Sequence, residues 1–331
     1  MINVRKYLSR TQESIGGAIP SGLALFVVMF FYWIQQPLIL SDFGVAGLFN
    51  QSVALTIAAI AQTLVVVSGA IDLSVGSLIG LTACFAATYM GDSVVTAVGI
   101  ILATLLLGAV AGSLNGVLVA HGKLEPLIAT LTTSFVFQGV SLILRPTPGG
   151  SVAPWFSSAL TGSFGYFPAS ACLLAVCLLV FWLPVMRSGL GREIEAVGNN
   201  EQNAYLSGLS PKRAKIVAYS FSGLLSSAAG LFLVAQTGSG DAALGQVYTL
   251  NSIACVVLGG ISLRGGKGSV FGPVLSAFLL SIIVSALLAW GISAFWQNLV
   301  QGSILVLVLI GAGLPLLRSR SWTRFVRGQL S

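Results

Sequence analysis

Long, nearly uncharged apolar segments dominate this chain and limit what it can fold into. The runs Ala54–Val67 and Ile304–Ile310 carry no charge, and only 8% of the 331 residues are charged. A soluble domain has about 25% charged residues, so this chain cannot cover a water-facing surface in the usual way. The composition excludes a soluble enzyme and a nucleic-acid-binding protein. It predicts an all-α protein that crosses a membrane several times.

Glycine, proline and charged residues divide the chain into about ten expected spans. The expected spans are 19–40, 51–69, 74–91, 94–119, 126–144, 167–186, 216–236, 249–263, 269–290 and 296–316. Ten spans place both termini on one side. If that side is the cytoplasm, 15 of the 16 Lys and Arg residues fall inside and only Arg145 falls outside, in agreement with the positive-inside rule. Because almost no loop separates 51–69 from 74–91, one of the two is predicted to be broken or re-entrant.

The polar segments are too small for an independent catalytic domain. We expect a cytoplasmic N-terminus (1–18), a membrane domain (19–316) and a basic cytoplasmic tail (317–331). Within the membrane domain, 145–165 is expected to be an external loop and 187–215 a cytoplasmic one. The chain is therefore predicted to be non-catalytic.

Side chains that bind metals or nucleotides are scarce. The four cysteines lie in apolar runs and His121 is the one histidine, so we expect no metal site and no catalytic triad. The segment Gly265–Ser269 resembles a phosphate-binding loop. However, Ile261 and Gly268 stand where that motif needs Gly and Ser or Thr, so we expect this chain to bind no ATP and no other cofactor.

Small residues recur at four-residue spacing in two expected helices. The two sets are Gly108, Gly112 and Gly116, and Ser222, Ser226 and Gly230. Such spacing favours close helix packing. Lining of a transport pathway is the alternative interpretation.

The segment Ser68–Ser77 places Asp72 in the middle of an apolar stretch. An ionisable group at membrane depth is costly and needs a polar partner or a wet cavity. One interpretation is a polar element at a break in a transport helix. The other is local: Asp72 or Ser74 caps a helix that starts near Val75.

A weak internal similarity relates two parts of the chain. Val66-Val67 followed by Gly76–Gly80 resembles Val256-Val257 followed by Gly268–Gly272. Internal duplication is common in transporters, and chance similarity between segments rich in Gly and Val is the alternative.

Polar side chains inside the expected spans are candidates for a translocation pathway. They are Gln62, Asp72, Ser74, Asn115, Thr130, Thr132, Thr133, Gln138 and Asn251. Each could instead form an interhelical hydrogen bond.

The expected cytoplasmic loop 187–215 contains a short amphipathic segment. The pattern predicts a helix around Glu201–Leu206, ended by Gly208. Such a helix suits docking into a groove of a cytoplasmic partner, and a solvated connector is the alternative.

Four ordered stretches resemble the permease subunits of bacterial ABC importers of the ribose/xylose type. They are Ser68–Ser77, Lys123–Ser141, Gly191–Gly208 and Leu250–Gly272. Thr249 and Asn251 depart from that family, in which Glu and Asp are usual. This departure suggests a diverged substrate or one half of a heteromeric permease pair.

The resemblance implies import of a small polar solute, such as a monosaccharide, across the bacterial inner membrane by alternating access. The implied partners are a cytoplasmic ABC ATPase that uses ATP and Mg²⁺, an external solute-binding protein, and a second permease copy or paralogue. The implied ATPase-docking positions are Gly198, Asn200, Ala204 and Gly208. We expect the basic tail to contact membrane lipid. The alternative function is ion-coupled secondary transport, against which the near isolation of Asp72 counts.

Overall fold

The computed structural model describes residues 4–293, 296–297, 299–304 and 306–307, with side chains from residue 18 onward. The helices of 15 residues or more are α1 (Val4–Gln35), α2 (Asp42–Val67), α3 (Val75–Tyr89), α4 (Val94–Ala120), α5 (Pro126–Leu144), α11 (Pro211–Thr237) and α13 (Phe271–Ala289). The shorter elements are η1 (Pro37–Leu40), α6 (Pro154–Thr161), β1 (Ser163–Phe164), β2 (Phe167–Pro168), α7 (Ala169–Val176), η2 (Cys177–Trp182), α8 (Leu183–Arg187), α9 (Gly189–Asn199), α10 (Glu201–Leu206) and α12 (Gln246–Leu258).

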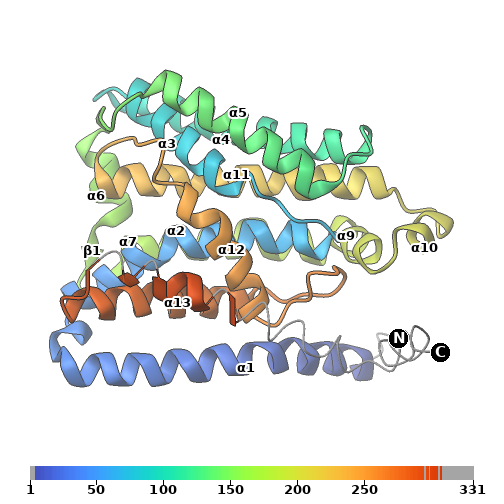
Figure 1. Ribbon diagram of the computed structural model, residues 1–331, viewed down its shortest axis with the longest axis horizontal. Helices are drawn as coiled ribbons and strands as arrows, with labels where there is room; N and C mark the ends of the chain where they lie inside the picture. Colours follow the sequence, from blue (N-terminus) through green and yellow to red (C-terminus); the bar gives the residue numbers. More distant parts are fainter. Residues whose placement is uncertain (1–3, 294–295, 298, 305, 308–331) are drawn as a thin grey trace, which may run out of the picture.

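The described part of the chain is a bundle of long apolar helices, as expected of an all-α membrane protein (Figure 1). Seven helical segments are long and apolar enough to cross a membrane: α1, α2, α4, α5, the continuous helix Ala169–Arg187, α11 and α13. In Ala169–Arg187, the six-residue π-helix η2 joins α7 to α8. Helices α3 and α12 are apolar but shorter. The expected tenth span, 296–316, lies largely outside the described residues, and the tail 317–331 lies wholly outside them.

Local signals set several helix ends away from the expected positions. Helix α1 ends at Gln35, just before Pro37, rather than at residue 40. Helix α2 starts at Asp42, not at residue 51, because the Ser41 hydroxyl accepts from the Gly44 N–H and caps it. The expected external loop 145–165 is not wholly irregular, since it contains helix α6 and strand β1.

Helices α2 and α11 form the centre of the bundle, and α11 packs along α4. The glycine stripe of α4 makes this close approach possible. A side chain at Gly112 would collide with the backbone of Tyr219, and one at Gly108 would collide with Gly223 and Ser227. The packing interpretation of this stripe is therefore confirmed.

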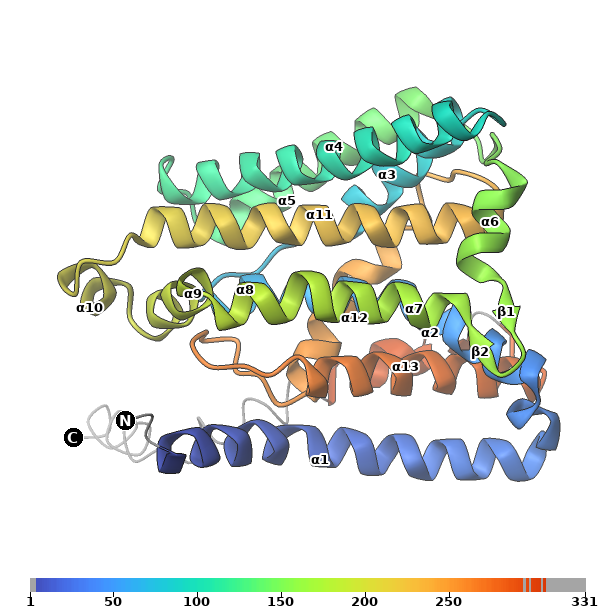
Figure 2. The same cartoon turned by 180° about the vertical axis from the view of Figure 1, so that it is seen from behind.

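The two central helices begin two units of the same design, which run in opposite directions (Figures 1 and 2). Helix α2 leads through the non-helical linker 68–74 into the short helix α3, and α11 leads through the linker 238–245 into the short helix α12. The N-terminal ends of the two short helices meet at the backbones of Gly76 and Gly245, where any side chain would collide. Neither helix of the pair expected to hold a break is itself interrupted: α2 is continuous over 26 residues and α3 over 15, and the non-helical linker 68–74 lies between them.

A second structural repeat supports the internal similarity, with a shift of one residue. Helix α2 ends with Gly69 at φ +84°, and the Ala70 N–H donates to the Val65 carbonyl at 3.2 Å. Helix α12 ends in the same way: Gly260 has φ +80°, and the Ile261 N–H donates to the Val256 carbonyl at 3.1 Å. Both ends are Schellman-type stops, which need the left-handed conformation that glycine adopts freely.

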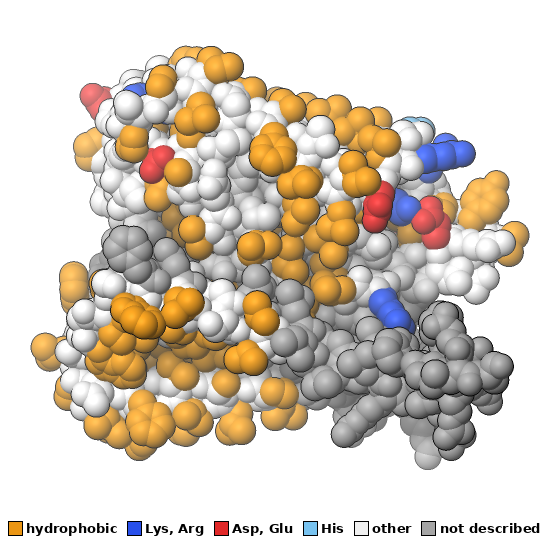
Figure 3. All heavy atoms as spheres, viewed as in Figure 1, with side chains coloured by type: hydrophobic (Ala, Val, Ile, Leu, Met, Phe, Trp, Pro, Cys, Tyr) orange, Lys and Arg blue, Asp and Glu red, His pale blue; other side chains and the backbone are white. Residues whose placement is uncertain are grey.

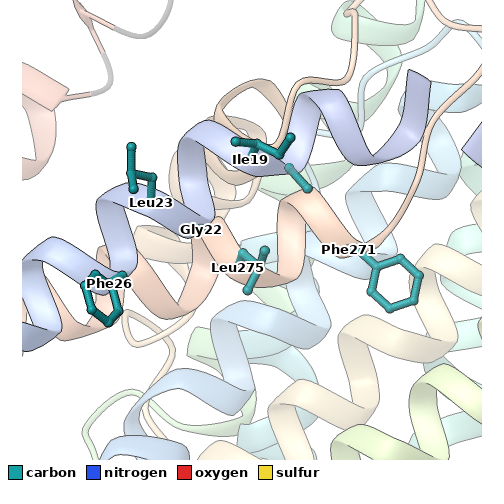
Figure 4. Close-up of a pocket in the computed structure, with 7 residues that line it drawn as sticks. Ile19, Gly22, Leu23, Phe26, Phe271 and Leu275 are labelled. Atoms are coloured by element: carbon teal, nitrogen blue, oxygen red, sulfur yellow. The ribbon is translucent and has the colours of Figure 1, made fainter. Parts of the chain in front are cut away.

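The outer faces of the bundle are apolar, and much of the charge gathers at one end. Large exposed apolar side chains cover α1, α4 and α5, and Figure 3 shows hydrophobic atoms over the long sides and most of the visible Lys and Arg at the end with α9 and α10. An apolar groove of about 490 Å³ is lined by residues of α1 and α13 (Figure 4). It is lined by Ala18, Ile19, Gly22, Leu23, Phe26, Phe271 and Leu275. Its lining residues contribute no polar side chain.

Candidate functional site

The linker 68–74 carries a buried, non-helical backbone through the interior of the bundle. Ser68, Ala70, Asp72 and Ser74 are all buried. Between the hydrogen bonds of Ser68 to Leu64 and of Leu78 to Ser74, the linker leaves the regular i to i−4 pattern of the adjoining helices. Irregular backbone at this depth needs partners from the surrounding protein.

Side chains of three helices supply those partners. Gln62 of α2 is oriented so that its Nε2 donates to the Asp72 carbonyl at 3.0 Å and its Oε1 accepts from the Asp72 N–H at 3.2 Å. The Tyr219 hydroxyl of α11 donates to the Ile71 carbonyl at 3.2 Å. Thr130 of α5 accepts from the Leu73 N–H at 3.0 Å. The linker is thus fixed by specific side chains rather than by regular secondary structure.

The Asp72 carboxylate ties the linker to α11 and, through Ser74, to α4. Its Oδ1 accepts from the Ser74 N–H at 2.9 Å and from the Ser74 hydroxyl at 2.6 Å. Its Oδ2 accepts from the Ser222 hydroxyl at 3.2 Å. Asn115 of α4 donates to the Ser74 hydroxyl oxygen at 2.7 Å. All the donors to the carboxylate are neutral, so the group is held by hydrogen bonds and not by an ion pair.

The capping interpretation of Asp72 and Ser74 is wrong. Helix α3 does start at Val75, with Ser74 as its N-cap residue, but no side chain caps it. The Ser74 hydroxyl donates to Asp72 instead, and the Asp72 carboxylate accepts from Ser74 itself. The carboxylate therefore holds the turn that precedes the helix.

Five of the nine predicted pathway residues meet in this network, which we call the Asp72 joint: Gln62, Asp72, Ser74, Asn115 and Thr130. Sequence reasoning missed two of its members. In the sequence, Ser222 stands out only as part of a small-residue stripe. Nothing in the sequence marks Tyr219 as a partner of the linker, although both residues bond to it in the structure.

The other four predicted pathway residues lie apart from the Asp72 carboxylate. Thr133 is buried one turn along α5, and its hydroxyl donates to the Thr130 carbonyl at 3.1 Å. Thr132 is exposed, and its hydroxyl donates to the Ile128 carbonyl of its own helix. Gln138 and Asn251 are half-buried on α5 and α12. A single pathway that contains all nine stays a prediction.

Helix α10 forms where the sequence predicts it, and three of the four predicted docking positions build it. The Asn200 side chain accepts from the Asn203 N–H at 2.8 Å and caps the helix. Ala204 is buried beneath it. Gly208, at φ +81°, ends it, with the Leu209 N–H donating to the Ala204 carbonyl.

The surface that α10 offers to a partner consists of other residues. Tyr205 is 69% exposed and Leu206 is 75% exposed. A cavity of about 700 Å³ borders this helix and the turn between α4 and α5, and Lys123, Lys212 and Lys215 are among its lining residues. Lys215 pairs with Glu201 at 2.7 Å. The predicted positions hold the helix, while Tyr205 and Leu206 form its exposed apolar tip.

The fourth predicted docking position, Gly198, joins α9 to the membrane body. A side chain there would collide with the carbonyl of Val67 and with Gly266. The Gly266 N–H donates to the same Val67 carbonyl at 2.9 Å. The end of α2, the helix α9 and the 259–270 loop therefore meet directly at the start of the linker 68–74.

A bundle of membrane-length helices, with a non-helical linker inside and a surface helix at one end, defines a multi-pass membrane transport subunit. Residues 44–309 match the family described as branched-chain amino acid transport system / permease component. The chain belongs to this permease family, whose members are transport components rather than catalysts.

Curated relatives cover most of the chain. A ribose import permease protein of Escherichia coli is 37% identical over 278 residues, which are 81% of this chain and 86% of the relative. A ribose import permease protein of Bacillus subtilis is 33% identical and covers 87% of this chain and 90% of the relative. An autoinducer 2 import system permease protein of Escherichia coli is 32% identical, with 81% and 83% covered. No solved structure matches the chain.

Proposed function

We propose that this chain is the permease subunit of an ABC importer that carries a neutral monosaccharide into a bacterial cell. The surface helix α10 carries the argument, because it exposes Tyr205 and Leu206 to solvent and is held on a buried scaffold. A separate cytoplasmic ATPase, which binds ATP and Mg²⁺, docks on this tip. The import of ribose and of autoinducer 2 by relatives supports a sugar-like solute.

The proposed orientation places α9 and α10 in the cytoplasm of a bacterium, beneath its inner membrane. The chain then has ten membrane segments, the last of them in 296–316, and both termini are cytoplasmic. Arg145 lies at the opposite end, where its side chain donates to Thr88 and to the Ala87 carbonyl. The gathering of Lys and Arg at the end with α10 supports this direction.

The proposed complex has two permease subunits, which are either two copies of this chain or this chain and a paralogue. A solute-binding protein delivers the sugar to the external end, and the basic tail 317–331 contacts lipid. Closure of the ATPases pushes α10 and α9. The contact of Gly198 with Val67 passes this movement to the linker 68–74. The Asp72 joint then couples α2 to α4, α5 and α11 during alternating access.

The α10 proposal is tested by removing one exposed apolar side chain. Leu206→Ser should weaken ATPase binding about 10- to 100-fold, because burial of a leucine side chain contributes about 1.5–3 kcal/mol and about 1.4 kcal/mol corresponds to tenfold in affinity. ATPase affinity is measured with the permease in nanodiscs, and uptake with the full complex in proteoliposomes.

Leu38→Ser is the matched control, because Leu38 is 78% exposed and lies in η1, at the end away from α10. This variant should bind the ATPase as the wild type does. Equal losses in the two variants, or solute uptake by wild-type vesicles without ATP, would contradict the proposal.

A further inference from the structure

A second polar feature lies at the end of the bundle opposite α10. A cavity of about 530 Å³ is formed by the first turns of α2, the end of α6 with β1, and the end of α11. Its lining residues are Phe43, Ala46, Gly47, Asn50, Gln51, Thr161, Gly162, Ser163 and Gln236. Its volume falls within the range of about 300–1,000 Å³ that is usual for small-molecule sites.

The lining of this cavity combines uncharged polar side chains with apolar ones. Asn50, Gln51 and Gln236 contribute amides, Ser163 contributes a hydroxyl, and Phe43 contributes an exposed aromatic ring. A charged solute would find no opposite charge among the lining residues, and an apolar solute would leave the amides without partners. The apolar groove between α1 and α13 has none of these groups.

Asn50 supplies a specific reason to expect a ligand. Its Nδ2 donates to the Thr161 carbonyl at 2.8 Å, and this bond fixes which end of the amide is the donor. Its Oδ1 is then a buried acceptor without a hydrogen-bond partner in the described part of the chain. Buried polar atoms are nearly always paired, so a hydroxyl donor from a bound molecule would satisfy this oxygen.

A neighbouring amide is also oriented by a contact within the protein. Gln51 accepts through Oε1 from the Ser285 hydroxyl at 2.5 Å. That bond uses its acceptor end, so the Nε2 donor is the group that remains for the cavity. The wall therefore combines an acceptor at Asn50 with a donor at Gln51, and a sugar hydroxyl can both donate and accept.

We infer that this cavity is an entry site for a neutral polyhydroxylated solute, where a monosaccharide arrives before it passes between the helices. The role as an entry site rests on the proposed function, because the cavity faces the outside of the cell only if α10 is cytoplasmic. Its chemistry stands on the lining residues alone.

The chain offers a matched pair of substitutions for a test. Gly47 lines the cavity, and a side chain added there would meet open space. Gly47→Leu should therefore fill the cavity without disturbing the fold. Gly99 of α4 is exposed and also has open space around it, so Gly99→Leu adds the same side chain away from the cavity.

The readout is protection of a reporter cysteine, with the full-length permease in nanodiscs and no ATPase or binding protein present. Ser163→Cys places a thiol in the cavity wall, and Ser158→Cys places one on an exposed part of α6 that does not line the cavity. Both are labelled with a membrane-impermeant thiol reagent in the presence of D-ribose, D-xylose, D-galactose or ribose 5-phosphate. The unsubstituted protein gives the background.

At least one neutral sugar should slow labelling at position 163 about threefold when present at twice its dissociation constant, since only the empty fraction reacts. Labelling at position 158 should not change. Gly47→Leu should abolish the protection and Gly99→Leu should retain it. Protection that survives Gly47→Leu, protection by ribose 5-phosphate alone, or no protection by any neutral sugar would overturn the inference. Because no ATPase is present, these outcomes are distinguishable from failure of the ATPase-docking proposal.

Discussion

The two linkers that interrupt the central units are held in different ways. The linker 68–74 depends on side chains from α2, α5 and α11, with Gln62 alone pairing both backbone groups of Asp72. In the linker 238–245, the side chains of Thr237 and Asp241 bond within the linker, and its contact with the segment 145–165 includes backbone hydrogen bonds. Gly240 exchanges two hydrogen bonds with Gly149 of the segment 145–165, at 2.8 and 3.0 Å.

The aspartates of the two linkers, Asp72 and Asp241, differ in the same way: one bonds to another helix and the other bonds locally. Asp72 is 2% exposed and accepts from α11 as well as from its own turn. Asp241 is half-buried, and its carboxylate accepts from the Ala243 N–H two residues on, at 2.8 Å. The same architecture is therefore built once as a cross-helix joint and once as a local turn. The linker 68–74 begins next to Gly198 of α9, which contacts Val67 and Gly69.

The largest expected difference in stability comes from replacing one glutamine near each linker with leucine. Gln62→Leu leaves the N–H and carbonyl of Asp72 unpaired in the interior, so it should lower the free energy of unfolding by about 2–4 kcal/mol. Gln246→Leu, at the exposed start of α12, should change it by less than about 0.5 kcal/mol. SDS-induced unfolding of the purified permease measures both. Equal losses would show that the linkers are held alike.

A smaller difference is expected for the two aspartates. Asp72→Ala leaves the donors Ser74 and Ser222 without their acceptor, so it should lower the free energy of unfolding by about 1–3 kcal/mol. Asp241→Ala should lower it by about 0.5–1 kcal/mol. Asp72→Asn keeps an acceptor oxygen for Ser74 and separates the effect of charge from that of shape. If Asp72→Asn matches the wild type in both unfolding and uptake, the negative charge has no role; if it matches Asp72→Ala, the charge is needed.

The smallest expected effect concerns a single hydroxyl. Tyr219→Phe removes the bond to the Ile71 carbonyl and should cost about 0.5–1 kcal/mol. Tyr205→Phe, on the exposed tip of α10, makes the same chemical change outside the joint and should leave unfolding unchanged. If Tyr205→Phe lowered the free energy of unfolding as much as Tyr219→Phe does, the Asp72 joint could not explain the loss at Tyr219.

The sequence determined the features that depend on composition and local pattern. The scarcity of charge predicts membrane helices, because uncharged apolar segments of this length have few alternatives. The amphipathic pattern over Glu201–Leu206 and the glycine Gly208 after it predict the short helix α10, because both signals act within a few residues. The interruption near Asp72 is visible as polar residues in an apolar stretch.

Only the tertiary structure decided how the polar residues pair. Ser222 lies 150 residues from Asp72 along the chain, and Tyr219 lies 148 residues from Ile71, so no local pattern could assign these contacts. The same holds for the cavity lined by Asn50 and Ser163, whose wall joins Asn50 to the end of α6 across 111 residues. Helix boundaries follow from nearest neighbours, whereas hydrogen bonds between helices depend on which faces the packed bundle brings together.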